Sequence, residues 1–477
     1  IDEENYLEIP KIVLGIQKSG AVCLMINRED PEERIKYILK KSKSKLIISD
    51  NKEIGNWKLK IENLDIKRER LEKYNTEPSK GKGIQGQDTA FIIFTSGTTG
   101  APKGIKVSAR GLVNESYYKT RDMGSEKINM ISLNFSLQYT ASIEYICASF
   151  VLGKKLLIYS KQEIHDPYAV MKKAEENNLT YIGMTPSVLN SYLEIIEDSS
   201  SAKEKIALKK LKTIDLMGEK TYSQLAKRFY SQYPHITLNI EYGSSECLSC
   251  SYGFIPKDIK SGVLRKIKEG KAVRNQQVYV LDKDQKLLPI NAIGEIYCSG
   301  YGLFNGYMGN KRENNSKFLT HPFIKGKKIY RSGDKGRIDI EGNLEVKGRT
   351  DDQVQVRGQR VELDEIREVI KTIPEIQEVL VQAKKTKKSY NLDMVCYYAV
   401  KDAIDTSRIK AVLERQVPKY MTPLYFIELD KFPLNQNGKI NRDKLPEPKE
   451  EDLLKSEFVE PNTEIAKKIA NIWQKVL

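Results

Sequence analysis

The chain has few of the residues that most often bind metals or carry out catalysis. Its 477 residues include three histidines, two tryptophans and six cysteines. So few histidines disfavour histidine-based catalysis and histidine metal sites, and six cysteines are too few for a dense disulfide framework. Cys247 and Cys250 have C-x-x-C spacing, but no second pair or histidine cluster in the sequence completes a zinc site.

Long apolar runs are also absent. No run approaches the roughly 20 residues that cross a bilayer, and the opening I-D-E-E-N is not typical of a signal peptide. We therefore expect a reducing, cytoplasmic setting and no membrane partner.

The net charge of +15 raises the question of nucleic-acid binding. The basic residues, however, occur in short runs along the chain, such as residues 203–212 and 384–388, without interleaved aromatic residues. A solvated basic surface explains this pattern, and we expect no nucleic-acid partner.

Strand-like and helix-like segments alternate through the first half of the chain. We expect strands at 45–49, 91–94, 155–159 and 213–216, and helices at 30–41 and 222–233. This alternation predicts α/β layers with parallel strands. From 278 to 346 the pattern changes to strand–turn–strand, which indicates a β-rich subdomain.

The second half divides into smaller units. A strong helix candidate at 362–371 lies near the start of a small C-terminal α+β domain. We predict an α/β large domain at 1–350, the small domain at 351–446, a charged, proline-containing linker at 447–461, and an amphipathic helix at 462–477.

The stretch from Phe91 to Ile105 has a pattern suited to phosphate binding. An apolar strand, F-I-I-F, leads into the hydroxyl- and glycine-rich T-S-G-T-T-G, and Lys103 follows. Such a loop can surround an anion with N–H groups and hydroxyls, while the lysine adds positive charge. The common P-loop spacing is absent. A nucleotide-phosphate loop of another kind is favoured over a flexible surface turn.

The segment T-S-G-T-T-G-A-P-K-G resembles the phosphate loop of the adenylate-forming superfamily, which includes acyl-CoA synthetases, luciferases and adenylation domains of nonribosomal peptide synthetases. Further segments that resemble the family follow in its order: K-S-G-A (18–21), Y-R-S-G-D (330–334), G-R-T-D-D-Q-V (348–354), R-G-Q-R-V-E (357–362) and N-G-K-I-N-R (437–442). By this resemblance the chain begins inside its first subdomain. Residues 458–477 resemble the entry helix of a carrier-protein domain, although an ordinary terminal helix remains the alternative.

The resemblance implies ATP and Mg²⁺ as cofactors. The phosphates would be held by Thr95, Ser96, Gly97, Thr98, Thr99, Gly100 and Lys103. Tyr242 would lie on the adenine, Asp334 and Arg349 would hold the ribose, and Glu246 would bind Mg²⁺ as its metal ligand. The family pattern N-x-Y-G-P-T-E is altered here to I-E-Y-G-S-S-E.

The resemblance also assigns the catalytic groups. Lys439 would bridge the substrate carboxylate and the adenylate, assisted by Lys103 and Glu246. Asp351 would be the hinge about which the small, mobile domain rotates between two half-reactions. The partner would be the phosphopantetheine arm of a carrier-protein domain, in cis or in trans, beside other peptide-synthetase domains.

The substrate positions depart from the usual pattern. The aspartate that binds the α-ammonium in this family is replaced by Thr140. The remaining pocket positions carried over from the family are Ala141, Glu144, Gly183, Asp215, Met217, Glu241, Ser249 and Cys250. Three acids in one pocket would have raised pKa values unless a cation joins them. We therefore expect a cationic carboxylic acid whose amine lies away from the α-position. The alternatives are acids that face solvent, or a register one residue off.

The sequence thus predicts an AMP-forming acid–thiol ligase, an adenylation domain that loads a carrier protein. A free-standing acyl- or aryl-CoA ligase is the alternative with the same fold. An inactive scaffold or a basic nucleic-acid-binding protein is the remote one.

Overall fold

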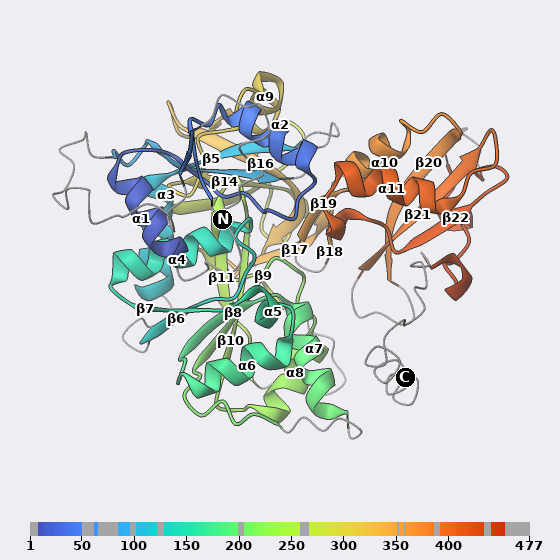
Figure 1. The fold of residues 1–477 in the computed structure, drawn as a ribbon. Helices are drawn as coiled ribbons and strands as arrows, with labels where there is room; N and C mark the ends of the chain where they lie inside the picture. The colour runs from blue at the N-terminus through green and yellow to red at the C-terminus, as the bar shows by residue number, and fades with distance from the viewer. Residues whose placement is uncertain are drawn as a thin grey trace.

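The computed structural model describes residues 8–49, 62–64, 84–95, 102–121, 128–198, 205–257, 267–350, 353–356, 359–385, 392–433 and 440–453. A large N-terminal part, blue to yellow in Figure 1, lies beside a smaller orange-to-red part. Within these ranges no helix has the length and apolarity needed to cross a membrane. The architecture is α/β, as predicted.

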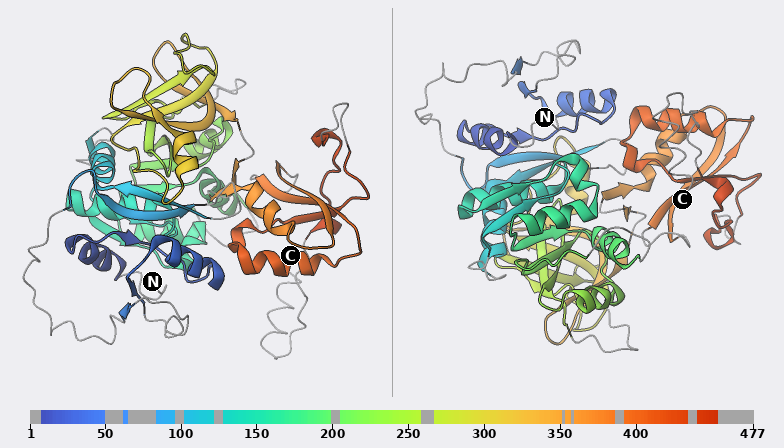
Figure 2. Two further views of the ribbon diagram at one scale, coloured as in Figure 1. Left: turned by 90° about the horizontal axis from the view of Figure 1, so that it is seen from above. Right: turned by 60° about the horizontal axis from the view of Figure 1, so that its bottom comes forward.

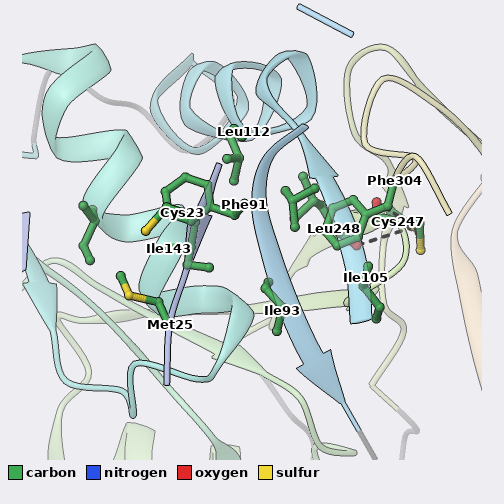
Figure 3. Close-up of a cluster of buried hydrophobic side chains, with 14 of the residues drawn as sticks. Cys23, Met25, Phe91, Ile93, Ile105, Leu112, Ile143, Cys247, Leu248 and Phe304 are labelled. Atoms are coloured by element: carbon green, nitrogen blue, oxygen red, sulfur yellow. Dashed lines mark hydrogen bonds between the residues drawn. The ribbon is translucent and has the colours of Figure 1, made fainter. Parts of the chain in front are cut away.

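The apolar run before the phosphate loop forms strand β4 (Thr89–Thr95), which is central in a three-stranded sheet. It pairs in parallel with β1 (Cys23–Leu24) and antiparallel with β5 (Lys103–Ser108). Phe91 and Ile93 of β4 belong to a large buried cluster that also contains Ile143 (Figure 3). Because β4 is anchored in this core, the loop that follows it starts from a fixed point. The N-terminal helices are α1 (Ile9–Lys18) and α2 (Glu32–Ser42).

A five-stranded sheet follows, in the order β12-β11-β10-β9-β8. The strands are β8 (Tyr181–Met184), β9 (Thr213–Met217), β10 (Thr237–Ser244), β11 (Leu248–Phe254) and β12 (Lys271–Ala272). The parallel pairing that the sequence predicts is confirmed for β8, β9 and β10 but is wrong for β10 and β11, which are antiparallel. The connection 245–247 is too short for the crossover that parallel neighbours need.

Helices cover this sheet and connect it to the rest of the large part. In Figure 1, α6, α7 and α8 lie along the green strands. Helices α3 and α4 pack against each other and lie on the left of the view in Figure 1, and β6 pairs in parallel with β7. The bounds are α3 (Ala109–Arg121), β6 (Met130–Leu133), α4 (Thr140–Leu152), β7 (Lys155–Ile158), α5 (Lys161–Ile164), α6 (Pro167–Glu176), α7 (Pro186–Glu197) and α8 (Ser223–Gln232).

The predicted β-rich subdomain is present as an antiparallel sheet. It contains β13 (Gln276–Leu281), β14 (Gly294–Gly300), β15 (Phe318–Thr320), β16 (Lys328–Ile338) and β17 (Leu344–Arg349), with α9 (Lys311–Lys317) beside β15. The β16–β17 pairing places Asp334 opposite Arg349. Two residues that lie 15 positions apart in the sequence are therefore direct neighbours across the sheet.

The C-terminal part has an apolar core of its own, which includes Val361, Ile366, Cys396 and Leu413. Both views in Figure 2 show it as a separate unit beside the large part. Its elements are β18 (Gln353–Val356), β19 (Gln359–Glu362), α10 (Leu363–Ile370), β20 (Ile376–Lys385), β21 (Leu392–Val400), α11 (Thr406–Gln416) and β22 (Tyr425–Glu428). The boundary at 350/351, the linker and the terminal helix stay predictions, because residues 351–352 and 454–477 lie outside the described ranges.

A buried ion pair joins the two parts. Arg34 Nη1 of α2 lies 2.9 Å from Glu365 Oε1 of α10, and both side chains are almost fully buried. Removing one member leaves the other charge buried without its partner, which costs about 3–5 kcal/mol.

We therefore expect Arg34→Met to lower the free energy of unfolding by about 3–5 kcal/mol, measured by urea titration. Arg34→Met/Glu365→Gln should recover much of this loss, because the second change removes the unpaired carboxylate. The matched control is Lys36→Met on the same helix, a half-buried lysine that pairs with the exposed Glu32 and should change stability little. Equal effects of the Arg34 and Lys36 single variants would contradict a role for burial.

A second buried acid, Glu269, lies just before β12 and contacts β17. Its carboxylate accepts a hydrogen bond from the Val346 N–H at 2.8 Å, and burial raises the pKa of Glu269 from 4.5 to about 7. An acid with a raised folded-state pKa destabilises the fold once pH exceeds that value and has no such effect below the unfolded-state pKa. Glu269→Gln should therefore stabilise the protein at pH ~8 by up to ~3 kcal/mol and leave it unchanged near pH ~4. Thermal melts at both pH values test this. A stabilisation of the same size at both pH values would show that Glu269 does not titrate between them.

Candidate functional site

A cavity of about 510 Å³ lies where the β10–β11 hairpin, the β16–β17 pair and the C-terminal part meet. Figure 1 shows β17, β18 and β19 between the two parts of the molecule. The cavity is lined from the large part by residues of α4, β10, β11, β16 and β17, and from the small part by Val354, Gln355, Arg360, Lys385 and Leu392. Movement of the small part would therefore change the shape of this cavity.

The three residues expected at the adenine and ribose lie together in its wall. The Tyr242 hydroxyl donates to Asp334 Oδ2 at 2.6 Å, and Arg349 Nη1 donates to Asp334 Oδ1 at 3.0 Å. Burial, with the Asp334 charge beside it, raises the pKa of Tyr242 well above its usual range, so the phenol stays neutral and donates. Asp334 is thus an oriented acceptor that hydroxyl groups of a ligand can share.

Lys103 lies at the base of the expected phosphate loop. It pairs with Thr95 across β4 and β5, it is buried, and its Nζ lies 2.8 Å from Glu313 Oε1 of α9. It does not line the cavity described above. The intervening residues, Ser96, Gly97, Thr98, Thr99 and Gly100, lie outside the described ranges. Lys103 is therefore held by the fold rather than exposed, and an acid that the sequence did not indicate is its partner.

Glu246, the expected metal ligand, lies in the turn between β10 and β11. The Tyr307 hydroxyl donates to its Oε1 at 2.7 Å, and Arg360 Nη1 lies 2.8 Å and 2.6 Å from its two carboxylate oxygens. Burial opposes ionisation, but Arg360 outweighs it and lowers the pKa of Glu246 to about 2. An ionised carboxylate is a suitable ligand for Mg²⁺, and Glu246 fits that role only when Arg360 moves away. The sequence did not indicate Arg360.

Of the nine predicted substrate residues, six line the cavity and three do not. The six are Thr140, Ala141, Glu144, Met217, Glu241 and Ser249. The other three, Gly183, Asp215 and Cys250, are absent from its wall. A side-chain carbon on Gly183 would lie 2.1 Å from the Tyr145 hydroxyl, so glycine there makes room for the tyrosine. Thr140 Oγ1 hydrogen-bonds Ser245 Oγ at 2.8 Å.

The three predicted acids lie close together, and two further charged residues lie beside them. Asp215 and Glu241 are diagonal neighbours on adjacent strands, because Asp215 pairs with Asn239 and side chains two residues apart share a face. Helix α4 adds Glu144, and α3 adds Glu115 and Lys119. The Lys119 Nζ is within 4 Å of a carboxylate oxygen of each of the four acids.

Lys119 and Glu115 were missed by the sequence analysis. Their spacing of four residues was the available signal, since residues four apart are neighbours on a helix. That signal does not say which other helices or strands the pair faces. Lys119 thus supplies one positive charge to these acids from within the chain, and the expected cationic substrate stays a prediction.

Cys298 of β14 brings a third thiol to Cys247 and Cys250. The three sulfur atoms lie within 4.8 Å of one another, and all three residues belong to the apolar core, part of which Figure 3 shows. Buried thiols commonly pack as small apolar side chains, which accounts for their position.

Lys439 and Asp351 lie outside the described residues. Their expected roles as catalytic lysine and hinge stay predictions.

Comparison with known proteins now bears on this geometry. Residues 1–308 match the family model of AMP-binding enzymes. The chain is 31% identical over 477 residues to gramicidin S synthase 2 of Aneurinibacillus migulanus, covering 99% of this chain and 10% of that protein. It is also 31% identical over 470 residues to bacitracin synthase 3 of Bacillus licheniformis, covering 98% of this chain and 7% of that protein. The chain thus spans a tenth or less of the length of these relatives.

Two solved structures share the fold. The o-succinylbenzoate CoA synthetase of Bacillus subtilis has a TM-score of 0.77 at 20% identity, covering 94% of this chain and 87% of that one. An artificially fused adenylation–carrier di-domain from Klebsiella oxytoca has a TM-score of 0.76 at 19% identity. The match covers 88% of this chain and 81% of that one. The match to the family model spans well over half of the chain, and the chain therefore belongs to the AMP-binding enzyme family.

Proposed function

We propose that this chain activates a carboxylic acid with ATP and transfers the acyl group to the phosphopantetheine thiol of a carrier protein, as a peptide-synthetase adenylation domain. The observation that carries the proposal is that one cavity is lined both by Tyr242, Asp334 and Arg349 and by Thr140, Glu144 and Glu241. A nucleoside and an acid bound at these two ends would meet between them.

In the first half-reaction a carboxylate oxygen attacks the α-phosphorus of ATP, and pyrophosphate leaves. In the second, the thiol attacks the acyl carbon, AMP leaves, and the thiol proton passes to solvent. Neither step requires a nucleophile from the protein, so positioning and charge neutralisation are the tasks left to it. Mg²⁺ bound to the triphosphate would supply neutralising charge.

The chain's own residues would position the reactants and supply further positive charge. Asp334, oriented by Tyr242 and Arg349, would hold the ribose hydroxyls. Lys103 would exchange Glu313 for a phosphate oxygen. Lys439, by resemblance, would place its ammonium between the carboxylate and the α-phosphate, where negative charge converges.

Acid-dependent exchange of pyrophosphate into ATP tests the first half-reaction. We expect exchange with at least one acid from a panel of α-amino, β-amino, diamino, guanidino, hydroxy, aryl and fatty acids. Lys439→Ala should reduce kcat/KM by about 100-fold or more, because it removes charge stabilisation of the transition state. The matched control Lys444→Ala changes an exposed lysine nearby and should keep wild-type exchange. Equal activity of both variants would remove Lys439 from the proposal.

A free-standing CoA ligase is the second candidate, favoured by the shared fold with a CoA synthetase and by Thr140 in place of an aspartate. The thiol acceptor distinguishes the two functions. Faster thioester formation on a phosphopantetheinylated carrier protein than on coenzyme A supports the proposal, and the reverse order supports the ligase.

The Arg360–Glu246 ion pair leads to a prediction for metal dependence. Because Arg360 contacts both oxygens of Glu246, metal binding by this carboxylate and the ion pair exclude each other. Arg360→Gln should therefore lower the Mg²⁺ concentration that gives half-maximal exchange, and Glu246→Gln should raise it, each by about tenfold. Arg331→Gln, which changes an exposed ion pair with Glu295, is the control. An unchanged Mg²⁺ requirement in both variants would show that Glu246 is not a metal ligand.

A further inference from the structure

Among the described residues, the acid end of the cavity has four carboxyl groups near a single lysine, Lys119. Lys119 lies 2.7 Å from Glu241 and 3.1 Å from Glu115, but 3.7 Å from Glu144 and 3.9 Å from Asp215. All five side chains are less than a tenth exposed. A buried charge without a partner is costly, so this cluster cannot hold four ionised carboxylates against a single ammonium.

The lysine is shared unequally among the acids. Glu241 and Glu115 lie within hydrogen-bonding distance of its ammonium, and the Ser249 hydroxyl contacts both of them. Asp215 Oδ2 instead accepts a hydrogen bond from the Tyr181 hydroxyl at 2.8 Å. Among the residues that the structure describes, none hydrogen-bonds the Glu144 carboxyl.

The pKa shifts follow this division only in part, because burial raises the pKa of Glu115 although Lys119 beside it opposes the shift. Burial opposes the ionisation of Glu241, yet Lys119 beside it lowers the pKa of that carboxyl. Burial raises the pKa of Glu144 well above its usual range, and the Glu115 charge adds to the effect. Burial and the Glu241 charge likewise raise the pKa of Asp215. These pKa shifts favour the protonated form of Glu144 and of Asp215.

Position decides which of these acids a ligand can reach. Glu144 and Glu241 line the cavity, whereas Lys119, Glu115 and Asp215 are not in its wall. Glu144 also lies four residues after Thr140 on α4. That spacing is one helical turn, a rise of about 6 Å. Among the described residues, the Glu144 carboxyl at the cavity has no hydrogen-bond partner. It lies one helical turn from Thr140, which has no carboxyl group.

We propose that Lys119 determines substrate specificity from behind the cavity wall: it pairs with Glu241 and Glu115, and so leaves Glu144 to bind one basic group of the substrate. This inference rests on the proposed function and names its substrate class. The substrate is a carboxylic acid with a single amine or guanidine several bonds from the carboxylate. When it binds, the O–H bond of Glu144 breaks, the proton passes to solvent, and the carboxylate pairs with the ammonium, which keeps its own protons.

The first test compares acids of matched length in pyrophosphate exchange: δ-aminopentanoate, pentanoate, δ-hydroxypentanoate and glutarate, with ornithine as the diamino acid. The wild type should prefer δ-aminopentanoate over its neutral counterparts and reject glutarate. Glu144→Gln should reverse that preference by about 10- to 100-fold, the effect of a hydrogen bond to a charged group. An unchanged ratio in Glu144→Gln, or a wild-type preference for the neutral acids, overturns the inference while the adenylation activity stands.

The second test addresses Lys119 itself. Lys119→Met leaves Glu241 at the cavity without its counterion, so preference should shift from δ-aminopentanoate towards ornithine. Lys119→Met/Glu241→Gln removes both charges and should restore the preference for the monoamino acid, even if the single variant folds poorly. Lys172→Met, which changes an exposed lysine, should behave as the wild type. A double variant that keeps the preference of the single variant contradicts the assigned role.

Calorimetry separates this inference from the proposed function. Binding of δ-aminopentanoate with a non-hydrolysable ATP analogue, measured in two buffers of different ionisation enthalpy, should release a proton in the wild type and none in Glu144→Gln. Binding without proton release overturns the exchange at Glu144 but not the activity. If no acid binds and none supports exchange, the proposed function fails, and the substrate class fails with it.

Discussion

The constraint on which this site depends is that its buried charges, as far as the described residues show them, are held in ion pairs. Asp334 pairs with Arg349, Glu246 with Arg360, Lys103 with Glu313, and Lys119 with Glu241. Each pair joins residues from different helices or strands, so the pairs also fix how those elements pack. An unpaired buried charge is far more costly than a paired one. A charged ligand would therefore have to replace the partner of such a group, whereas hydroxyl groups can share Asp334 while it keeps Arg349.

The pairs differ in how readily they can exchange. Arg349 and Asp334 are neighbours in one sheet and stay together whatever the small part does. Arg360 belongs to β19 in the small part, whereas Glu246 belongs to the large part. Rotation of the small part would break that pair and no pair within the large part. Glu246, the expected metal ligand, is thus the group whose partner depends on the position of the small part. Metal binding by Glu246 would therefore be coupled to the arrangement of the two parts.

The β10–β11 hairpin brings these sites together. It contributes Glu241 to the acid end of the cavity, Tyr242 to the end that contains Asp334 and Arg349, and Glu246, the expected metal ligand, in its turn. The strand register shifts between Tyr242 and Gly243, and a side-chain carbon on Gly243 would lie 2.1 Å from the Leu248 carbonyl oxygen. Only glycine allows the two strands to approach this closely. The bulge changes the regular alternation, so residues near each other in sequence reach different ends of one cavity.

The elements were predictable from the sequence where local pattern decides them. The apolar run at Phe91 became β4, and the periodic segment predicted at 362–371 became α10. The antiparallel β11 was missed because pairing direction depends on the length of the connection. The convergence of Glu144, Asp215 and Glu241 was predictable only through the family resemblance, and their counterion was not predictable at all. Lys119 reaches them through the packing of α3 against α4, which no spacing in the sequence expresses.

This built-in counterion resolves a conflict between stability and binding. Four buried carboxyl groups with no cation would repel one another and oppose folding, whereas four fully neutralised ones would leave nothing for a basic substrate to bind. With one lysine for four acids, the free protein remains foldable because the surplus acids keep their protons. The same surplus gives the cavity a latent negative charge, which appears only when a cation arrives to stabilise it. Selectivity then arises from the ligand's ability to replace a proton, so a neutral acid of the same shape gains none of that stabilisation.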